Sequence, residues 1–158
     1  MAIAIRKGND KDLPALMEMI KELGAFERQP KAVRNTVAQM RKQKKFFKSF
    51  IAAEDGKIVG SAIYFFAYST WVGKSLYLED LYVKPKYRNR KVGSMLLREI
   101  FKLAKKEDCG RVRWQVIHWN KDAIRLYERH GAKISRQWLN CDFDRQGIER
   151  FLRKSATD

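Results

Sequence analysis

The residues best suited to binding or chemistry form a basic loop, residues 88–91 (Arg-Asn-Arg-Lys), which is followed by Val92 and Gly93. An apolar, strand-like segment precedes this loop, and an amphipathic, helix-like segment follows it. The first turn of a helix has backbone N–H groups without intrahelical partners, and these groups favour an anion at that end. The loop therefore predicts a phosphate-binding site, although the same residues also suit an ordinary basic turn before a helix.

Three other residues carry groups that could move protons. Glu79 and Asp80 are adjacent on a predicted strand, so their side chains point to opposite faces and line one pocket only if a bulge intervenes. Tyr127 lies on a predicted short helix, on the face that it shares with Ala123 and Ile124. That spacing also suits a residue that only packs.

The hydrophobic patterning predicts the elements that must position these groups. An Asp-Gly pair at residues 55–56 favours a hairpin turn between two strands. The expected strands cover residues 2–7, 49–53, 57–68, 74–83, 112–117 and 133–143. The expected helices cover residues 13–23, a segment that begins at Pro30, residues 92–106 and residues 121–130. This order is typical of an α/β (α+β) domain in which helices flank a sheet.

Length and composition favour a single compact domain over residues 1–158, because 45% of these residues are hydrophobic. No apolar run is long enough to span a bilayer, and the N-terminus lacks the pattern of a secretion signal. We therefore expect a cytoplasmic protein with no membrane contact. Cys109 and Cys141 have no Cys or His at metal-ligand spacing, so no metal site is expected.

The formal net charge of +16 predicts attraction to a polyanion, but the charge alone does not identify which one. The strongly basic segment 41–48 is compatible with a solvated surface.

Residues 77–88 (YLEDLYVKPKYR) resemble the central strand and pyrophosphate loop of the GNAT superfamily of acetyltransferases. Residues 64–74, 119–120 and 126–132 are similar to its diamine branch, the spermidine/spermine and thialysine N-acetyltransferases. The resemblance is most specific over residues 60–132. It implies a GNAT fold, with a mixed, mostly antiparallel central sheet that splays between strands 4 and 5 and is flanked by helices. It also implies acetyl-CoA in the cleft between those strands, and a homodimer.

By this resemblance, the pantetheine arm of acetyl-CoA lies along the central strand and backbone amides of the basic loop hold the pyrophosphate. The residues expected at acetyl-CoA are Leu81, Tyr82, Val83, Arg88, Asn89, Arg90, Lys91, Val92, Gly93, Ser94 and Asn120. Lys91 departs from the family pattern, which has glycine at this position. If the position requires a positive φ, a lysine there costs about 1 kcal/mol or more, and facing a phosphate could offset part of that cost. We expect coenzyme binding to be weakened or reshaped but not lost.

The resemblance also assigns a catalytic role to Tyr127, and the chemistry of the transfer suggests one for Glu79. Tyr127 becomes the acid that protonates the departing CoA thiolate, because a phenol with a pKa of ~10 suits that leaving group. Direct attack in a ternary complex requires an unprotonated amine, and a carboxylate such as Glu79 could remove its proton. Either acid of the Glu79-Asp80 pair could equally cap a turn or pair with a basic residue.

The acceptor site follows from the same resemblance, since Phe26 and Glu27 match an aromatic and an acidic residue that contact substrate in the diamine branch. The residues expected at the acceptor are Phe26, Glu27, Trp71, Glu79 and Asp80. Acids that follow in polyamine-acetylating relatives are replaced here by Arg28, Gln29 and Lys31. We therefore predict a primary amine on a small diamine, thialysine-like or amino-acid-like molecule as the acceptor, or a lysine of an acidic protein, but not a long polycation.

An alternative function is that of a catalytically weak or inactive protein with the same fold, which regulates or binds nucleic acid or another acidic partner. The departure at Lys91 and the segment 28–48, which contains no Asp or Glu, motivate this alternative. The sequence shows no nucleic-acid-binding motif in its support.

Overall fold

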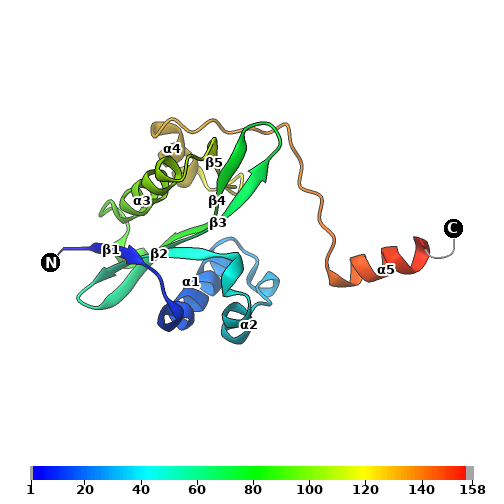
Figure 1. The fold of residues 1–158 in the computed structure, drawn as a ribbon. Helices are drawn as coiled ribbons and strands as arrows, with labels where there is room; N and C mark the ends of the chain where they lie inside the picture. Colours follow the sequence, from blue (N-terminus) through cyan, green and yellow to red (C-terminus); the bar gives the residue numbers. More distant parts are fainter. Residues whose placement is uncertain (1, 156–158) are drawn as a thin grey trace. The chain divides into compact units, whose positions relative to one another are not determined.

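A computed structural model describes residues 2–155 of the chain (Figure 1). The chain forms two compact units, residues 1–117 and residues 118–158. The first unit contains a sheet and three α-helices, and the second contains two α-helices. The expectation of a single domain over residues 1–158 stays a prediction.

A five-stranded mixed sheet forms the centre of the first unit, with the strand order β1-β2-β3-β4-β5. The strands are β1 (Ala4–Lys7), β2 (Lys48–Glu54), β3 (Lys57–Ser69), β4 (Gly73–Val83) and β5 (Arg111–Arg113). Strands β1 to β4 pair antiparallel, and β5 is parallel to β4. The predicted mixed, mostly antiparallel sheet is confirmed. The predicted hairpin turn is also confirmed, because Asp55 and Gly56 both adopt positive φ angles between β2 and β3.

The pairing of β4 with β5 is short and leaves most of β4 open on one edge. Strand β5 pairs only with Ser75, Leu76 and Tyr77, so the strand that we predicted over residues 112–117 is shorter than expected. Within residues 2–155, no strand pairs with this edge of β4 from Leu78 to Val83. The early end of the pairing agrees with the predicted splay between strands 4 and 5.

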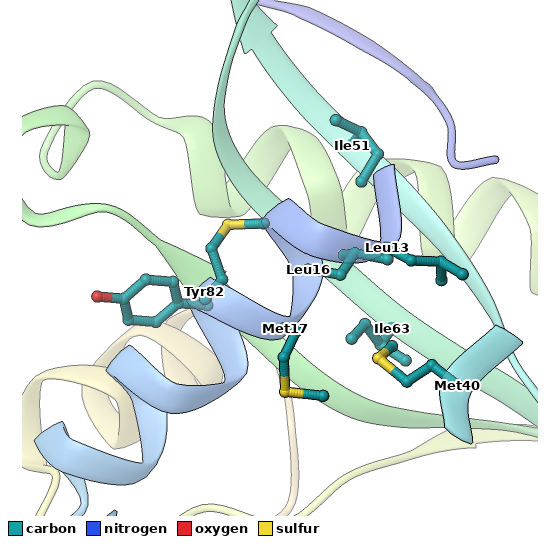
Figure 2. Packing of buried hydrophobic residues seen from close by; sticks show 8 residues of the cluster. Leu13, Leu16, Met17, Met40, Ile51, Ile63 and Tyr82 are labelled. Carbon is teal, nitrogen blue, oxygen red and sulfur yellow. The ribbon is translucent and has the colours of Figure 1, made fainter. Parts of the chain in front are cut away.

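Helices cover both faces of the sheet: α1 (Leu13–Phe26) and α2 (Val37–Lys42) lie on one face, and α3 (Val92–Lys106) lies on the other (Figure 1). Figure 2 shows the packing on the α1 face, where side chains of α1 and α2 meet side chains of the strands. The buried members of this cluster are Leu13, Leu16, Met17, Met19, Met40, Ile51, Ile63 and Tyr82. The buried residues of α3 are Val92, Leu96, Leu97, Ile100 and Ala104. The amphipathic helix that the sequence predicts over residues 92–106 is confirmed.

The segment after α1 differs from our expectation that a helix begins at Pro30. A short 3₁₀ helix (Pro30–Ala32) ends at Val33, whose backbone is extended. Helix α2 then begins anew, because the Thr36 side chain accepts the backbone N–H of Gln39 at 3.1 Å and caps its first turn. The other 3₁₀ helices are η1 (Asp10–Asp12), η3 (Lys44–Phe46) and η4 (Pro85–Tyr87).

The second unit contains α4 (Lys121–Arg129) and α5 (Arg145–Ser155). The side-chain carbonyl of Asn120 accepts the Ala123 N–H at 3.3 Å, and Gly131 has a φ of +87° just beyond α4. The predicted helix over residues 121–130 is therefore confirmed, with Asn120 as its cap and Gly131 just beyond its end.

The prediction of a final strand over residues 133–143 was wrong, because this segment contains no regular structure. A strand requires a neighbour for its backbone, and no strand of the described residues pairs with this segment. Helix α5, which we did not predict, follows it. The sequence contained a signal for α5, because Ile148, Phe151 and Leu152 recur at helical spacing. In the structure, the Asp144 carboxylate accepts the Gly147 N–H at 2.7 Å at the start of this helix.

Candidate active site

The phosphate loop, which we define as residues 88–91, leads from the 3₁₀ helix η4 into the first turn of α3. Lys91 is the N-cap residue of α3, and its carbonyl oxygen accepts the Met95 N–H at 2.9 Å. The N–H groups of the first turn, which include those of Val92 and Gly93, point along the helix axis and concentrate positive potential at this end. The structure therefore places this loop where backbone and dipole both favour an anion.

The backbone of the phosphate loop is strained at two residues. Lys91 has φ 62° and ψ 10°, and Asn89 also has a φ of 62°. This left-handed region costs a lysine about 1–2 kcal/mol, whereas asparagine tolerates it better. The condition that we attached to Lys91 is thus met: a residue with a side chain stands where the backbone favours glycine.

Arg88 ties the phosphate loop to the end of α1. Its Nε–H donates to the Val83 carbonyl at 3.1 Å, and its guanidinium lies 5.3 Å from the ring centroid of Phe26 and 5.7 Å from that of Tyr82. These three side chains line a cleft of about 650 Å³ together with Tyr87. The structure thus brings a predicted acceptor residue, Phe26, together with two predicted coenzyme residues.

The three strand residues predicted at the pantetheine arm, Leu81, Tyr82 and Val83, form the end of β4. They lie on the stretch of β4 that has no strand partner on the β5 side within the described residues. An unpaired strand edge presents backbone N–H and C=O groups that an extended amide-containing chain can pair with. Pantetheine contains two amides, so its chemistry fits this edge.

A β-bulge in β4 rearranges the two adjacent carboxylates. Asp80 is the partner of Ile63 and Leu78 is the partner of Tyr64, so Glu79 is the extra residue between them. Cross-strand partners share a face of the sheet, and Ile63 belongs to the cluster under α1. Asp80 therefore lies on the α1 face, as does Tyr82 two residues further on. The bulge that the two carboxylates would need in order to line one pocket is present.

The Asp80 carboxyl has an unusual environment. Burial raises its pKa to about 6, and the negative charges of Glu79 and Glu27 add to the effect. Glu27 caps the C-terminal end of α1, and burial raises the pKa of its carboxyl as well. The structure thus places Glu27, Glu79 and Asp80 within electrostatic range of one another, at the end of α1. A carboxyl that titrates near neutral pH is suited to proton transfer.

The two predicted aromatic residues lie far apart in the first unit. Phe26 ends α1 and is 39% exposed, whereas Trp71 is 80% exposed and lies in the turn between β3 and β4. Gly73, at the start of β4, is separated from Asp80 by about 23 Å of strand. The structure does not bring Trp71 together with Glu27 and Asp80, and its predicted role at the acceptor stays a prediction.

Asn120 and Tyr127 belong to the second unit. Tyr127 is the buried residue of α4, and its carbonyl oxygen accepts the Ala132 N–H at 3.0 Å. Burial suits either a packing residue or a catalytic phenol, so both interpretations remain open. The side-chain carbonyl of Asn120 is engaged in the helix cap.

Sequence reasoning missed one partner of the phosphate loop, Glu54 at the end of β2, which forms an ion pair with Arg90. The two residues are 36 positions apart, and no sequence motif links them. Within the described residues, no group of three or more His, Cys, Asp or Glu side chains is arranged to hold a metal ion. Among those same residues, no helix has the length and apolar character needed to cross a bilayer.

Comparison with known sequences identifies a family and close relatives. Residues 13–132 match the sequence model of the acetyltransferase (GNAT) family. The thialysine N-epsilon-acetyltransferase of Mus musculus is 31% identical over 159 residues, which cover 91% of this chain and 94% of that protein. The protein of the same name from Caenorhabditis elegans is 35% identical over 141 residues, which cover 86% of this chain and 88% of that protein.

Comparison with solved structures supports the fold. An integron cassette protein from the mobile metagenome of V. cholerae superposes with a TM-score of 0.78 at 19% identity, covering 97% of this chain and 99% of that one. AAC(6')-Iy, solved in complex with the bisubstrate analogue CoA-S-monomethyl-acetylneamine, has a TM-score of 0.73 at 18% identity, covering 91% of this chain and 99% of that one.

Proposed function

Because the chain belongs to the GNAT acetyltransferase family and is an N-acetyltransferase, we propose that it acetylates the primary amine of a small amino-acid-like or thialysine-like molecule. Acetyltransferases of this family use acetyl-CoA as the acetyl donor. The observation that carries the proposal is the similarity over most of both chains to thialysine N-epsilon-acetyltransferases. The geometry of the first unit supplies the physical reasons that follow.

Acetyl-CoA would bind along two features of the first unit. Its diphosphate fits the start of α3, where the helix dipole and the phosphate loop favour negative charge. Its pantetheine amides fit the unpaired edge of β4 from Leu81 to Val83. The net charge of +16 would raise the rate at which this polyanion reaches the site.

In the transfer step, the amine nitrogen attacks the thioester carbonyl carbon in a ternary complex, and the C–S bond breaks as the N–C bond forms. The sulfur takes a proton from the Tyr127 hydroxyl, and a carboxylate takes the proton that the amine loses. Backbone N–H groups of β4 would stabilise the developing negative charge on the carbonyl oxygen.

The carboxylate that accepts this proton is better assigned to Asp80 than to Glu79, the residue that we first expected. Asp80 titrates near pH 6, so at neutral pH it is ionised and still basic enough to accept a proton. Glu79, the exposed extra residue of the bulge, would assist by keeping negative charge beside Asp80. Glu27 would hold a second ammonium group of the acceptor by charge.

The acceptor panel that tests this proposal compares thialysine, lysine, ornithine, a short acidic peptide containing lysine, and spermine. The strongly positive chain should repel a long polycation, so we expect kcat/KM for spermine to be at least about tenfold below that for thialysine at low ionic strength. Release of CoA thiol measures each rate. A preference for spermine that persists at low salt would exclude the proposed acceptor class.

A homodimer is part of the proposal, and the second unit supplies its support. Helix α5 exposes Ile148, Phe151 and Leu152 on one face, with exposed fractions of 51%, 60% and 63%. Trp138 and Leu139 are also exposed. Apolar side chains that gather on a surface mark an interaction site, and we propose a second copy of the chain as the occupant.

The dimer can be tested with a change that adds charge to this face of α5. We expect the wild-type protein to sediment as a dimer and a variant carrying Ile148→Glu and Leu152→Glu to sediment as a monomer. A double change that also lowers the net charge by two, made at polar positions of α5, Gln146→Glu with Arg150→Gln, should leave the dimer intact. A wild-type protein that stays monomeric at high concentration would contradict the proposal.

The second candidate is a protein with the same fold that has lost turnover and binds an acidic partner. The strained lysine in the phosphate loop and the net charge of +16 favour it. This candidate predicts no acetyl transfer anywhere in the panel, together with polyanion binding that weakens steeply with salt. A cytoplasmic location stays a prediction in either case.

A further inference from the structure

Two charged side chains join the phosphate loop to the β2–β3 hairpin. Arg90 Nη1 lies 3.2 Å from Oε2 of Glu54, and Arg90 Nη2 contacts the other carboxylate oxygen of Glu54. The pair is therefore bidentate, the geometry in which an arginine and a carboxylate fix each other's orientation. The side chain of Arg90 is 42% exposed and that of Glu54 is 14% exposed, so the pair lies at the surface with its carboxylate partly covered.

Glu54 is well placed to act as a fixed point. It ends β2, pairs with Lys57 across the hairpin turn, and precedes the two positive-φ residues that form this turn. The Arg90 guanidinium also lies 5.4 Å from the ring centroid of Tyr87, the last residue of η4, which immediately precedes the loop. The side chain of Arg90 is thus held between a strand end and an aromatic ring.

The phosphate loop contains two strained backbone positions. Asn89 and Lys91, on either side of Arg90, both adopt left-handed φ angles. Such a conformation persists only where the surrounding structure holds it. Arg88 attaches the start of the loop to the Val83 carbonyl, and Arg90 attaches its middle to Glu54.

We propose that Glu54 and Arg90 are positioning residues for acetyl-CoA, which hold the phosphate loop in its strained conformation so that the first amides of α3 face the diphosphate. Arg90 then acts through the loop and does not contact the coenzyme phosphates itself. The inference rests on the proposed acetyl-CoA site and deepens it. It also reassigns Arg90, which the family resemblance had placed among the coenzyme-binding residues.

The direction in which two single substitutions change the affinity for acetyl-CoA separates a positioning role from direct contact with phosphate. Glu54→Gln removes a negative charge and Arg90→Gln removes a positive one, so effects through charge alone would oppose each other. If Arg90 bound phosphate directly, Glu54→Gln would free it and tighten binding. If the pair positions the loop, both substitutions loosen it, and we expect each to raise the Kd and KM for acetyl-CoA by about three- to tenfold with kcat nearly retained.

Two further variants sharpen the experiment. The double variant Glu54→Gln with Arg90→Gln should bind acetyl-CoA no more weakly than either single variant, because all three variants lose the same ion pair. Adding Lys91→Gly to Glu54→Gln should recover most of the lost affinity, because glycine adopts the left-handed conformation without strain. Glu99→Gln, which breaks the exposed pair with Lys102 on α3, is the matched control and should leave the Kd unchanged.

Calorimetry with acetyl-CoA, steady-state kinetics and thermal unfolding together decide the proposal. Surface ion pairs contribute little to global stability, so we expect the Tm values of the Glu54 and Arg90 variants to stay close to that of the wild type. Tighter binding by Glu54→Gln, or a loss confined to Arg90→Gln, would overturn the positioning role. Unchanged affinity in both variants would overturn it as well, whereas a wild-type protein that fails to bind acetyl-CoA would refute the proposed function itself.

Discussion

Replacing Tyr127 with phenylalanine is expected to lower kcat for acetyl transfer by about 10²- to 10⁴-fold, the usual contribution of a positioned general acid. The substitution removes one hydroxyl group and keeps the buried aromatic ring of this α4 residue, so the protein should still fold. Without the phenol, the CoA sulfur must leave as an unprotonated thiolate. The Kd for acetyl-CoA should change little, because the hydroxyl acts on the sulfur only as the C–S bond breaks.

The Tyr127 experiment is read as CoA thiol release at saturating acetyl-CoA and amine. Tyr68→Phe provides the matched control, because Tyr68 is 81% exposed on β3 and has no proposed role. The control should transfer acetyl at the wild-type rate. Equal rates for Tyr127→Phe and the wild type would leave Tyr127 as a packing residue only.

Replacing Asp80 with asparagine is expected to lower the rate of acetyl transfer and to raise the stability of the fold at neutral pH. The rate should fall by about 10²-fold or more, because the amide cannot accept the proton of the amine. In the wild type, kcat/KM should rise with pH through about 6 as Asp80 ionises, and this limb of the profile should be absent from the variant. Persistence of the limb in Asp80→Asn would assign it to another group.

The same substitution should stabilise the protein at neutral pH. The pKa of Asp80 in the folded protein is raised from 3.8 to about 6, so the folded state holds this proton more tightly than the unfolded state. The stability that the neutral carboxyl provides is present below about pH 4 and is lost as the pH rises to about 6. The full loss corresponds to at most about 3 kcal/mol. Asparagine carries no charge at any of these pH values, so the variant avoids this loss of stability.

Urea unfolding at pH 7.5 and at pH 4 measures this effect. We expect Asp80→Asn to be more stable than the wild type by about 1–3 kcal/mol at pH 7.5, and the gain to shrink toward pH 4. Asp122→Asn makes the same chemical change at a side chain that is 98% exposed, and this control should not be stabilised at pH 7.5. A variant that is less stable than the wild type at pH 7.5 would contradict the buried, charged state assigned to Asp80.

Local patterns were sufficient to predict most of the first unit. The apolar spacing of α3 and the Asp-Gly turn at residues 55–56 both have causes within a few residues, so they could be recognised from the sequence. The same holds for the Asn120 cap, whose partner is three residues away. Each of these contacts closes over a short stretch of chain, and at each of them sequence and structure agree.

Two failures concern local signals, since α5 was missed and the helix expected at Pro30 begins only at Val37. The other failures depend on distant or missing partners. Residues 133–143 have the composition of a strand, but pairing decides whether a strand forms, and composition does not show pairing. The ion pair between Glu54 and Arg90 joins residues 36 positions apart, so no local rule indicates it. The raised pKa of Asp80 depends on burial beneath α1 and on Glu27, both set by tertiary structure.

Release of CoA thiol upon mixing the wild-type protein with acetyl-CoA and thialysine tests the central claim most directly. The account predicts one equivalent of acetylated amine for each thiol released, at a rate that saturates with both substrates and depends on the Tyr127 hydroxyl. A purified, folded protein that releases no thiol with any primary amine at low ionic strength would contradict it.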